Sequence, residues 1–478
     1  LQYARVSEEP RAEGEIDLLN LTTDAVLPRV NRAERMTLRL RNTAGPLEDL
    51  SVSLRCPTGV DLLSPATQTI AALAYQQQAE LSWDVKAGAA GAIGMRVEAS
   101  GPGVTPMELA SSATFYPEIS VPKADYVPVP VPAKMSRYEI WTHYCPLWKQ
   151  GTHTGWKAIE PYPERKPVLG WYNEGTPDVA DWHIKYWLEH GISAAIYCWY
   201  RSSINGPVQQ SLGHAIHDGL FHSRYGSKFK FAIMWENQAK GSAGVASEKD
   251  FLENLLPFWI DNYFKHPSYL KVDGKPLLFI YRPEYLIGDL GGVEQVKTAL
   301  DKARQACVAA GFSGLTILGE DRGVHPGPLE LMKSEGLDRS FSYCWPVAQS
   351  PTPEQAIAAQ EAIWQKRKQM NVLPDLLTIS MGWDSTPWHS SSTIWRLPPE
   401  DFETLCRSAR EFMDDLPAGD LAGRMVLLDN WNEFGEGHYI APHREYGFGY
   451  LDAVRNAFCD IPRDHTDLVP EDLGLGPY

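Results

Sequence analysis

Eight short, apolar runs alternate with stretches of helical periodicity over the longer, C-terminal part of this chain. Strands that are apolar on both sides are buried on both faces, as in a parallel sheet covered by helices. Eight such strands, each followed by a helix, predict a (β/α)₈ TIM-type barrel. An open doubly wound sheet is the alternative, which the lack of a Gly-rich phosphate fingerprint after any run disfavours. The runs are Tyr138–Tyr144, Ser193–Tyr200, Phe229–Trp235, Pro276–Tyr281, Leu315–Glu320, Arg339–Trp345, Leu376–Trp383 and Met425–Trp431.

One helical stretch between these runs extends from Val293 to Ala310. Its apolar residues fall on one stripe, which predicts an amphipathic helix packed on the sheet, with Gly311 as its C-terminal cap. The residues of the stripe are Val296, Leu300, Ala303 and Cys307.

The first part of the chain has a two-residue period instead. Met36, Leu38 and Leu40 alternate with polar residues, and the same period recurs over residues 50–54, 81–85 and 93–97. Strands with one solvent-exposed face, separated by Gly, Pro and Asn turns, predict an antiparallel, immunoglobulin-like β-sandwich over residues 1–120. No catalytic constellation is present there, and a spacer role is favoured over glycan binding.

Prolines alternating with Val follow this region and favour a stiff, extended segment. They are Pro128, Pro130 and Pro132, with Pro122 ahead of them. We therefore predict a linker over residues 121–135 and a barrel domain over residues 136–478.

Charge and cysteine content narrow the classes of partner. The formal net charge of −16 disfavours nucleic acid and anionic membranes as partners. No stretch is long and apolar enough to span a membrane. The seven scattered cysteines include no CxxC pair, so neither a disulfide framework nor a zinc site is indicated. We expect a monomer without a cofactor. The first residue is Leu rather than Met, which is compatible with a removed export signal and with a secreted or periplasmic protein.

The segment Trp431–Gly437 follows the last apolar run and carries two acids three residues apart, Glu433 and Glu436. On a strand, residues three apart point to opposite faces. The chain must therefore curl at Gly435 for both carboxylates to reach one cavity, which glycine permits. Two acids at one strand end can divide the work of breaking a glycosidic bond, one protonated and one ionised. A solvated turn that happens to hold two Glu is the alternative.

Aromatic, acidic and Arg residues recur at the C-terminal ends of the predicted strands, where barrels place their sites. Taken alone, each Trp is at least as well explained by packing. Arg282 and Arg322 are expected to orient carboxylates rather than to bind an anion, with an acidic sugar as the alternative. The residues predicted to bind substrate are Glu236, Trp199, Trp235, Asn237, Tyr281, Glu320, Trp345, Trp383, Trp431, Asn432 and His438.

Four histidines also lie near the predicted strand ends: His143, His153, His438 and His443. None shows the spacing of a metal site, so no metal is predicted. His438 follows the two acids directly and is the candidate for a supporting hydrogen bond.

The motif Asn432–Gly437, with Trp431 before it, resembles the Asn-Glu-Trp-His-Glu-Gly segment of glycoside hydrolase family 99, which contains endo-α-mannosidases and endo-α-mannanases. It is still more similar to the WbsX type of bacterial polysaccharide-locus proteins, which are labelled as glycosyltransferases. Tyr446–Leu451, Gly170–Glu174 and Trp235–Asn237 also resemble that group. The resemblance covers roughly residues 137–457 and omits the predicted sandwich.

The resemblance to family 99 implies roles for both acids. Glu433 would act as a base on the 2-hydroxyl of the sugar, giving a 1,2-anhydro sugar and overall retention, and Glu436 as general acid/base. Glu236 would correspond to a substrate-binding acid. Gly435 replaces the His of the family, and Phe434 replaces its Trp, which implies a different substrate.

The leading hypothesis is therefore a retaining glycoside hydrolase that acts on an α-linked polysaccharide or oligosaccharide. The alternatives are a glycosyltransferase of polysaccharide synthesis and a catalytically silent glycan-binding protein. A transferase is expected to show a nucleotide-phosphate loop or a DxD-like motif at a strand end, and the sequence has neither. For a retaining mechanism we expect the two carboxyl groups to lie roughly 5–7 Å apart.

Overall fold

The structure is a computed structural model that describes residues 16–43, 45–134, 137–149, 155–239, 241–347, 349–390, 393–417, 419–460 and 465–478. Residues 1–15 of the predicted sandwich, residue 135 at the end of the predicted linker, residue 136 at the start of the predicted barrel domain, and His153 lie outside this description. The chain forms two compact units. One runs up to Lys123 and includes Leu468–Gly476, and the other comprises Ala124–Asp467 with Pro477–Tyr478.

The first unit is the predicted antiparallel sandwich. Met36, Leu38 and Leu40 are wholly buried, whereas Thr37 and Arg39 between them are not, so the two-residue period does mark an inner face. Arg29 bonds Asp472 through its Nε and Nη2 atoms at 3.0 and 2.6 Å, which fixes the segment Leu468–Gly476 to this unit. One sheet has the order β1 (Ile16–Thr23), β2 (Glu34–Asn42), β6 (Gln78–Ala87) and β4 (Val60–Leu62), and the other β5 (Thr67–Leu73), β3 (Leu47–Arg55), β7 (Gly91–Gly101) and β8 (Val104–Phe115).

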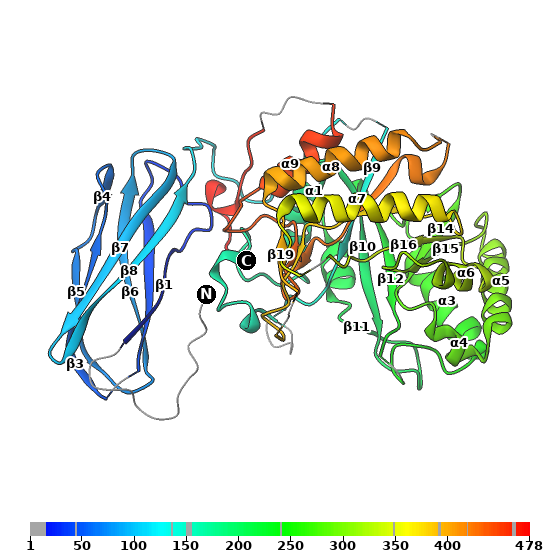
Figure 1. Ribbon diagram of the computed structural model, residues 1–478, viewed down its shortest axis with the longest axis horizontal. Coiled ribbons are helices and arrows are strands. Elements are labelled where there is room, and N and C mark those ends of the chain that lie inside the picture. Colours follow the sequence, from blue (N-terminus) through cyan, green and yellow to red (C-terminus); the bar gives the residue numbers. More distant parts are fainter. Residues whose placement is uncertain are drawn as a thin grey trace. The chain divides into compact units, whose positions relative to one another are not determined.

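The second unit is the predicted (β/α)₈ barrel (Figure 1). Its strands pair in parallel in chain order, and the last one pairs with the first. The sixth and seventh strands meet through the backbone of Ser340, which donates to Pro374 O and accepts from Leu376 N, both at 2.9 Å. Each of the eight predicted runs overlaps a barrel strand: β9 (Glu139–Tyr144), β10 (Ile192–Arg201), β12 (Lys230–Glu236), β14 (Lys275–Ile280), β15 (Thr316–Glu320), β16 (Arg339–Phe341), β17 (Leu377–Ile379) and β20 (Met425–Leu428).

Helical segments connect these strands. The predicted stripe on Val293–Ala310 is confirmed, since all four of its residues are wholly buried, and Gly311 follows the helix with a φ of +96°. The helices are α1 (Pro177–Glu189), α4 (Tyr285–Leu290), α5 (Val293–Ala309), α6 (Pro326–Ser334), α7 (Pro353–Met370), α8 (Pro399–Asp414) and α9 (Gly449–Phe458). Between β12 and β14 the helical segments are α2 (Glu248–Asp250), η6 (Phe251–Leu255), α3 (Leu256–Trp259) and η7 (Ile260–Phe264), and after β10 they include η3 (Ala215–Gly219) and η4 (Leu220–His222).

All seven cysteines are described, and none forms a disulfide, as expected. Among the described residues no helix is long and apolar enough to cross a membrane. The location of the protein in the cell and its oligomeric state stay predictions.

Candidate active site

The two acids of the motif lie on a hairpin that follows the eighth strand. β21 (Asn432–Glu433) pairs in antiparallel fashion with β22 (His438–Tyr439), which places Glu433 opposite His438. The backbone N–H groups of Glu436 and Gly437 both donate to Glu433 O, at 3.2 and 3.1 Å. The left-handed residue is Gly437, with a φ of +72°, and not Gly435 as predicted from the sequence. The chain therefore curls two residues later than expected.

Gly435 is required for a different reason, which is close packing. A Cβ built on Gly435 would lie 2.0 Å from Cε2 of the Trp388 indole. Trp388 is half-buried and lies on the loop after the seventh strand. Its ring occupies the space that a side chain at residue 435 would need, so an aromatic surface borders the two acids.

The two carboxylates lie close together. One oxygen of Glu433, one oxygen of Glu436 and one ring nitrogen of His438 all lie within 4.8 Å of one another. These two oxygens lie closer to each other than the roughly 5–7 Å expected between the carboxyl groups of a retaining pair. The same three side chains also have ligand types and spacing that suit a cation.

Glu433 is buried, and only one of its two carboxyl oxygens accepts a hydrogen bond. It is 3% exposed, and its Oε2 accepts a hydrogen bond from Tyr343 Oη at 2.9 Å. Its Oε1 is buried without a hydrogen-bond partner. Burial, and then the nearby charge of Glu436, raise the pKa of Glu433 to about 7. One oxygen of this carboxyl group thus has no hydrogen-bond partner within the part of the chain that the structure describes.

His438 connects Glu436 to a second buried acid. Its Nε2 lies 3.0 Å from Glu436 Oε2, and its Nδ1 lies 3.7 Å from Asp429 Oδ2. Burial by itself would lower the pKa of His438, but the nearby carboxylates of Asp429 and Glu436 outweigh it and raise the pKa to about 10. The ring is therefore an imidazolium at neutral pH. The predicted hydrogen-bonding role of His438 is seen in this contact, and Glu436 keeps 24% of its side chain exposed.

Asn432 organises the base of the hairpin. Its Oδ1 accepts from the backbone N–H of Cys145 at 2.8 Å, and its Nδ2 donates to Glu174 Oε1 at 2.7 Å. Trp148 donates from Nε1 to Asn432 O at 2.7 Å and from its backbone N–H to Glu174 Oε2 at 2.9 Å. The segments Gly170–Glu174 and Asn432–Gly437, which share the family resemblance, thus meet in one buried network.

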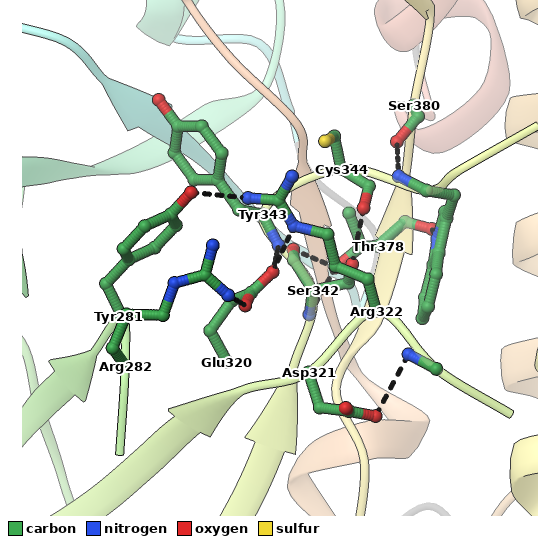
Figure 2. Close-up of polar contacts among 12 residues, drawn as sticks. Tyr281, Arg282, Glu320, Asp321, Arg322, Ser342, Tyr343, Cys344, Thr378 and Ser380 are labelled. Atoms are coloured by element: carbon green, nitrogen blue, oxygen red, sulfur yellow. Dashed lines mark hydrogen bonds and ion pairs between the residues drawn. The ribbon is translucent and has the colours of Figure 1, made fainter. Parts of the chain in front are cut away.

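A second cluster lies at the ends of the fourth and fifth strands (Figure 2). Arg322 donates from Nε to Glu320 Oε1 and from Nη2 to Tyr281 Oη, both at 2.6 Å. Arg282 Nη1 lies 3.8 Å from Glu320 Oε2. The two Arg side chains orient a buried carboxylate, which matches the role expected of them. The same carboxylate also accepts from the backbone N–H of Tyr343 at 3.3 Å, so the cluster positions the residue that holds Glu433.

Four of the predicted sugar platforms are packing residues. Trp199, Trp235, Trp345 and Trp431 are 0–1% exposed, so none offers a face to a ligand. Trp199 and Trp235 turn away from the barrel axis and pack edge-on against Trp259, with ring centroids 5.4 and 5.2 Å away. The sequence could not separate these outward positions from inward ones, because both are apolar in a covered barrel.

Of the other residues predicted to bind substrate, some support neighbouring backbone and others lie near the two acids. Asn237 is buried and bonds the backbone N–H and C=O of Arg282, both at 2.8 Å, so it supports a loop. Trp383 is half-buried, and its ring lies 5.1 Å from that of His438. Glu236 and Tyr281 are half-buried at strand ends. Buried His143 and His443 both have a lowered pKa because of their burial.

Three residues at the candidate site were not predicted from the sequence: Asp429, Tyr343 as a partner of Glu433, and Trp388. Asp429 could have been recognised from the sequence, because it is an acid directly after the apolar residues Met425–Leu428. Trp388 could not have been recognised from the sequence, since it lies in a loop five residues beyond the predicted strand and touches the motif only in the folded chain.

The second unit is thus a TIM-type barrel with two neighbouring acids at the C-terminal end of its eighth strand. Residues 160–454 match the family model described as Glycosyltransferase WbsX, and the chain belongs to this family.

Two curated relatives, both called uncharacterized protein WxcX and both from Xanthomonas campestris pv. campestris, are 24% identical to this chain over 338 residues. The match covers 64% of this chain and 45% of theirs, so the chain spans less than half the length of these relatives.

Among solved structures, the barrel is similar to a family 99 endo-α-mannosidase from Bacteroides thetaiotaomicron. The identity is 18% and the TM-score 0.46, with 68% of this chain and 99% of that chain covered. The chain is also similar to β-glucuronidase 2 of Bacteroides uniformis, with 11% identity, a TM-score of 0.38, and coverage of 92% and 50%.

Proposed function

We propose that this protein is a retaining glycoside hydrolase that cleaves an α-linked polysaccharide or oligosaccharide. The observation that supports this most is the placement of the Glu433 and Glu436 carboxylates within 4.8 Å of each other, at the C-terminal end of the eighth barrel strand. Two acids at this separation can act on one bond, and they border the half-buried aromatic rings of Trp383 and Trp388.

The environments of the two acids support different roles for them. Glu433 is buried, is fixed by Tyr343 and has one unpaired oxygen, which suits a base directed at the sugar. Glu436 keeps part of its side chain exposed, which suits a group that exchanges protons with water.

In the first step Glu433 takes the 2-hydroxyl proton as O2 attacks C1, while Glu436 protonates the departing oxygen. In the second step water adds to C1, Glu436 takes a proton from this water, and Glu433 returns its proton to O2. The sugar is released with retained configuration, and both acids regain their starting states. These roles follow the resemblance to family 99.

The test is cleavage of a panel of neutral and acidic polysaccharides, read from new reducing ends. We expect the wild type to cleave at least one glycan and Glu433→Gln to leave it intact. Equal cleavage by the two proteins would contradict the proposal.

The description of the family favours a second function, transfer of a sugar to a growing polysaccharide. A transferase would consume an activated donor and lengthen an acceptor without releasing reducing ends. The same panel, run with and without nucleotide sugars, separates the two functions.

The dependence of kcat/KM on pH tests the role of Glu433. A base must be ionised, so a pKa of about 7 predicts that kcat/KM rises with pH through about 7. If Glu433 were the general acid, kcat/KM would instead fall through the same range. In Glu436→Gln, assayed on a substrate with a good leaving group, the rising limb should move to lower pH because the neighbouring negative charge is gone.

Trp388 is expected to form a platform for the sugar. Trp388→Ala should raise KM about tenfold with little change in kcat, which corresponds to loss of about 1.4 kcal/mol of stacking. Trp388→Phe is the matched control and should keep most of the affinity. A KM unchanged in Trp388→Ala would remove this residue from the binding surface.

A further inference from the structure

A cluster of metal-ligand types lies in the barrel unit outside the candidate active site. His190, His465 and Asp467 each place one ligand atom within 4.8 Å of the others. Nε2 of His190 lies 3.2 Å and Nε2 of His465 lies 3.3 Å from the same oxygen, Asp467 Oδ1. Two imidazole nitrogens thus converge on one carboxylate oxygen.

The orientation of the His190 ring is fixed by its other nitrogen. Nδ1 lies 2.7 Å from the backbone oxygen of Tyr186, one helical turn earlier. A carbonyl oxygen only accepts, so Nδ1 carries a hydrogen, and Nε2 is the nitrogen that faces the cluster. Histidine ligands of metals are usually held in this way.

Both converging nitrogens are buried, and their contacts with Asp467 Oδ1 at 3.2 and 3.3 Å do not have the geometry of a hydrogen bond. His190 is wholly buried, so water does not serve its Nε2. Without metal, protonated rings pair with this carboxylate as ions, and a bound metal ion would replace both protons.

The distances suit a tetrahedral metal centre. Ligands about 2.0–2.1 Å from zinc lie about 3.3 Å from one another, close to the two measured N···O separations. A charge-assisted N–H···O bond is shorter, about 2.7–2.9 Å. A fourth donor is nearby, since Asp452 Oδ1 lies 3.7 Å from His190 Nε2 on a side chain that is 44% exposed and able to move.

We propose that His190, His465 and Asp467 bind a divalent metal ion of the zinc type, with Asp452 as the fourth ligand. Two neutral imidazoles and two carboxylates supply two nitrogen and two oxygen donors and a charge of −2, which neutralises the ion. The remaining acid nearby, Glu189, is already engaged through Oε1 with Lys185 at 2.5 Å and with the backbone N–H of Val131 at 3.0 Å.

The site is structural. His190 lies between α1 and the start of β10, on the side of the barrel opposite to the strand ends that carry Glu433. Bound metal would fasten residues 465–467 to the end of α1 and to α9. Because the ion binds only the folded chain, it would raise the melting temperature in a concentration-dependent way.

The test is zinc binding by chelator-treated protein, measured by calorimetry and by metal content after gel filtration. His465→Gln and Asp467→Asn remove one ligand each at partly exposed positions. His222→Gln is the control for an exposed histidine outside the cluster, and Glu436→Gln is the control for the three potential ligands of the active site.

We expect the wild type and both controls to bind one equivalent and to gain thermal stability. His465→Gln and Asp467→Asn should lose at least about tenfold in affinity, together with the stability gain. Cobalt in the wild-type site should give the visible spectrum of a four-coordinate ion. The proposal is overturned if the wild type binds no zinc, if both ligand variants bind as the wild type does, or if only Glu436→Gln loses the metal.

Discussion

Glu436→Gln is expected to lower kcat/KM on a polysaccharide by about 10²–10⁴-fold. Gln keeps the shape of Glu436 and its contact with His438 but has no proton to donate to the departing oxygen. On an aryl glycoside, whose leaving group departs without protonation, the loss in the bond-breaking step should be far smaller. The contrast between the two substrates identifies Glu436 as the acid rather than as a general structural element.

Glu330→Gln is the matched control, since Glu330 is an exposed acid on α6 with the same change in charge. It should keep wild-type rates on both substrates. Equal losses on the two substrates in Glu436→Gln, or no loss on either, would contradict the assigned role.

Glu433→Gln should raise the thermal stability of the protein while abolishing activity. The pKa of Glu433 is about 7 in the folded state, against an ordinary value of 4.5. Between these values the native state binds a proton that the unfolded state has released, so the free energy of unfolding falls as pH rises through this window. At pH 8 the carboxylate is ionised, and its burial costs up to about 3 kcal/mol.

A Gln at residue 433 does not ionise and can still accept from Tyr343. Its melting temperature should therefore exceed that of the wild type by several degrees at pH 8 and by much less at pH 5. Thermal melts of wild type, Glu433→Gln and Glu330→Gln at both pH values measure this. A stability difference of the same size at pH 5 and pH 8, or a less stable Glu433→Gln at pH 8, would show that Glu433 does not carry the raised pKa.

Much of the barrel could be predicted from the sequence, because the signal is local. A strand covered on both faces must be apolar throughout, so each strand is visible as a run such as Met425–Leu428. The ends of the runs also correctly indicated that acids and aromatic residues gather on one face. The stripe on α5 was visible for the same reason, since its period is that of the helix itself.

The details of the candidate site could not be predicted, because they depend on contacts between residues that are distant in the sequence. Gly435 and Gly437 look alike in the sequence. In the folded chain Gly435 lies against Trp388, whereas Gly437 lies against Asp384 and is the one with a positive φ. Tyr343 meets Glu433 across 90 positions of the chain.

The Trp residues at the strand ends show the same limit. Trp199 and Trp431 end apolar runs and lie at the expected face, yet both rings pack in the interior. Whether a side chain at the end of a barrel strand points to the axis or to the helices depends on register, and both environments select the same residue types. Composition alone therefore overstated the aromatic surface open to a sugar.

The most direct test of the paired-acid account is a reaction in ¹⁸O-labelled water with the glycan that the wild type cleaves. We predict that the new reducing end gains one ¹⁸O at the anomeric carbon with retained configuration, and that the double variant Glu433→Gln, Glu436→Gln releases no product. Label incorporation by the double variant at the wild-type rate, or chain growth from an activated donor without label, would contradict the account.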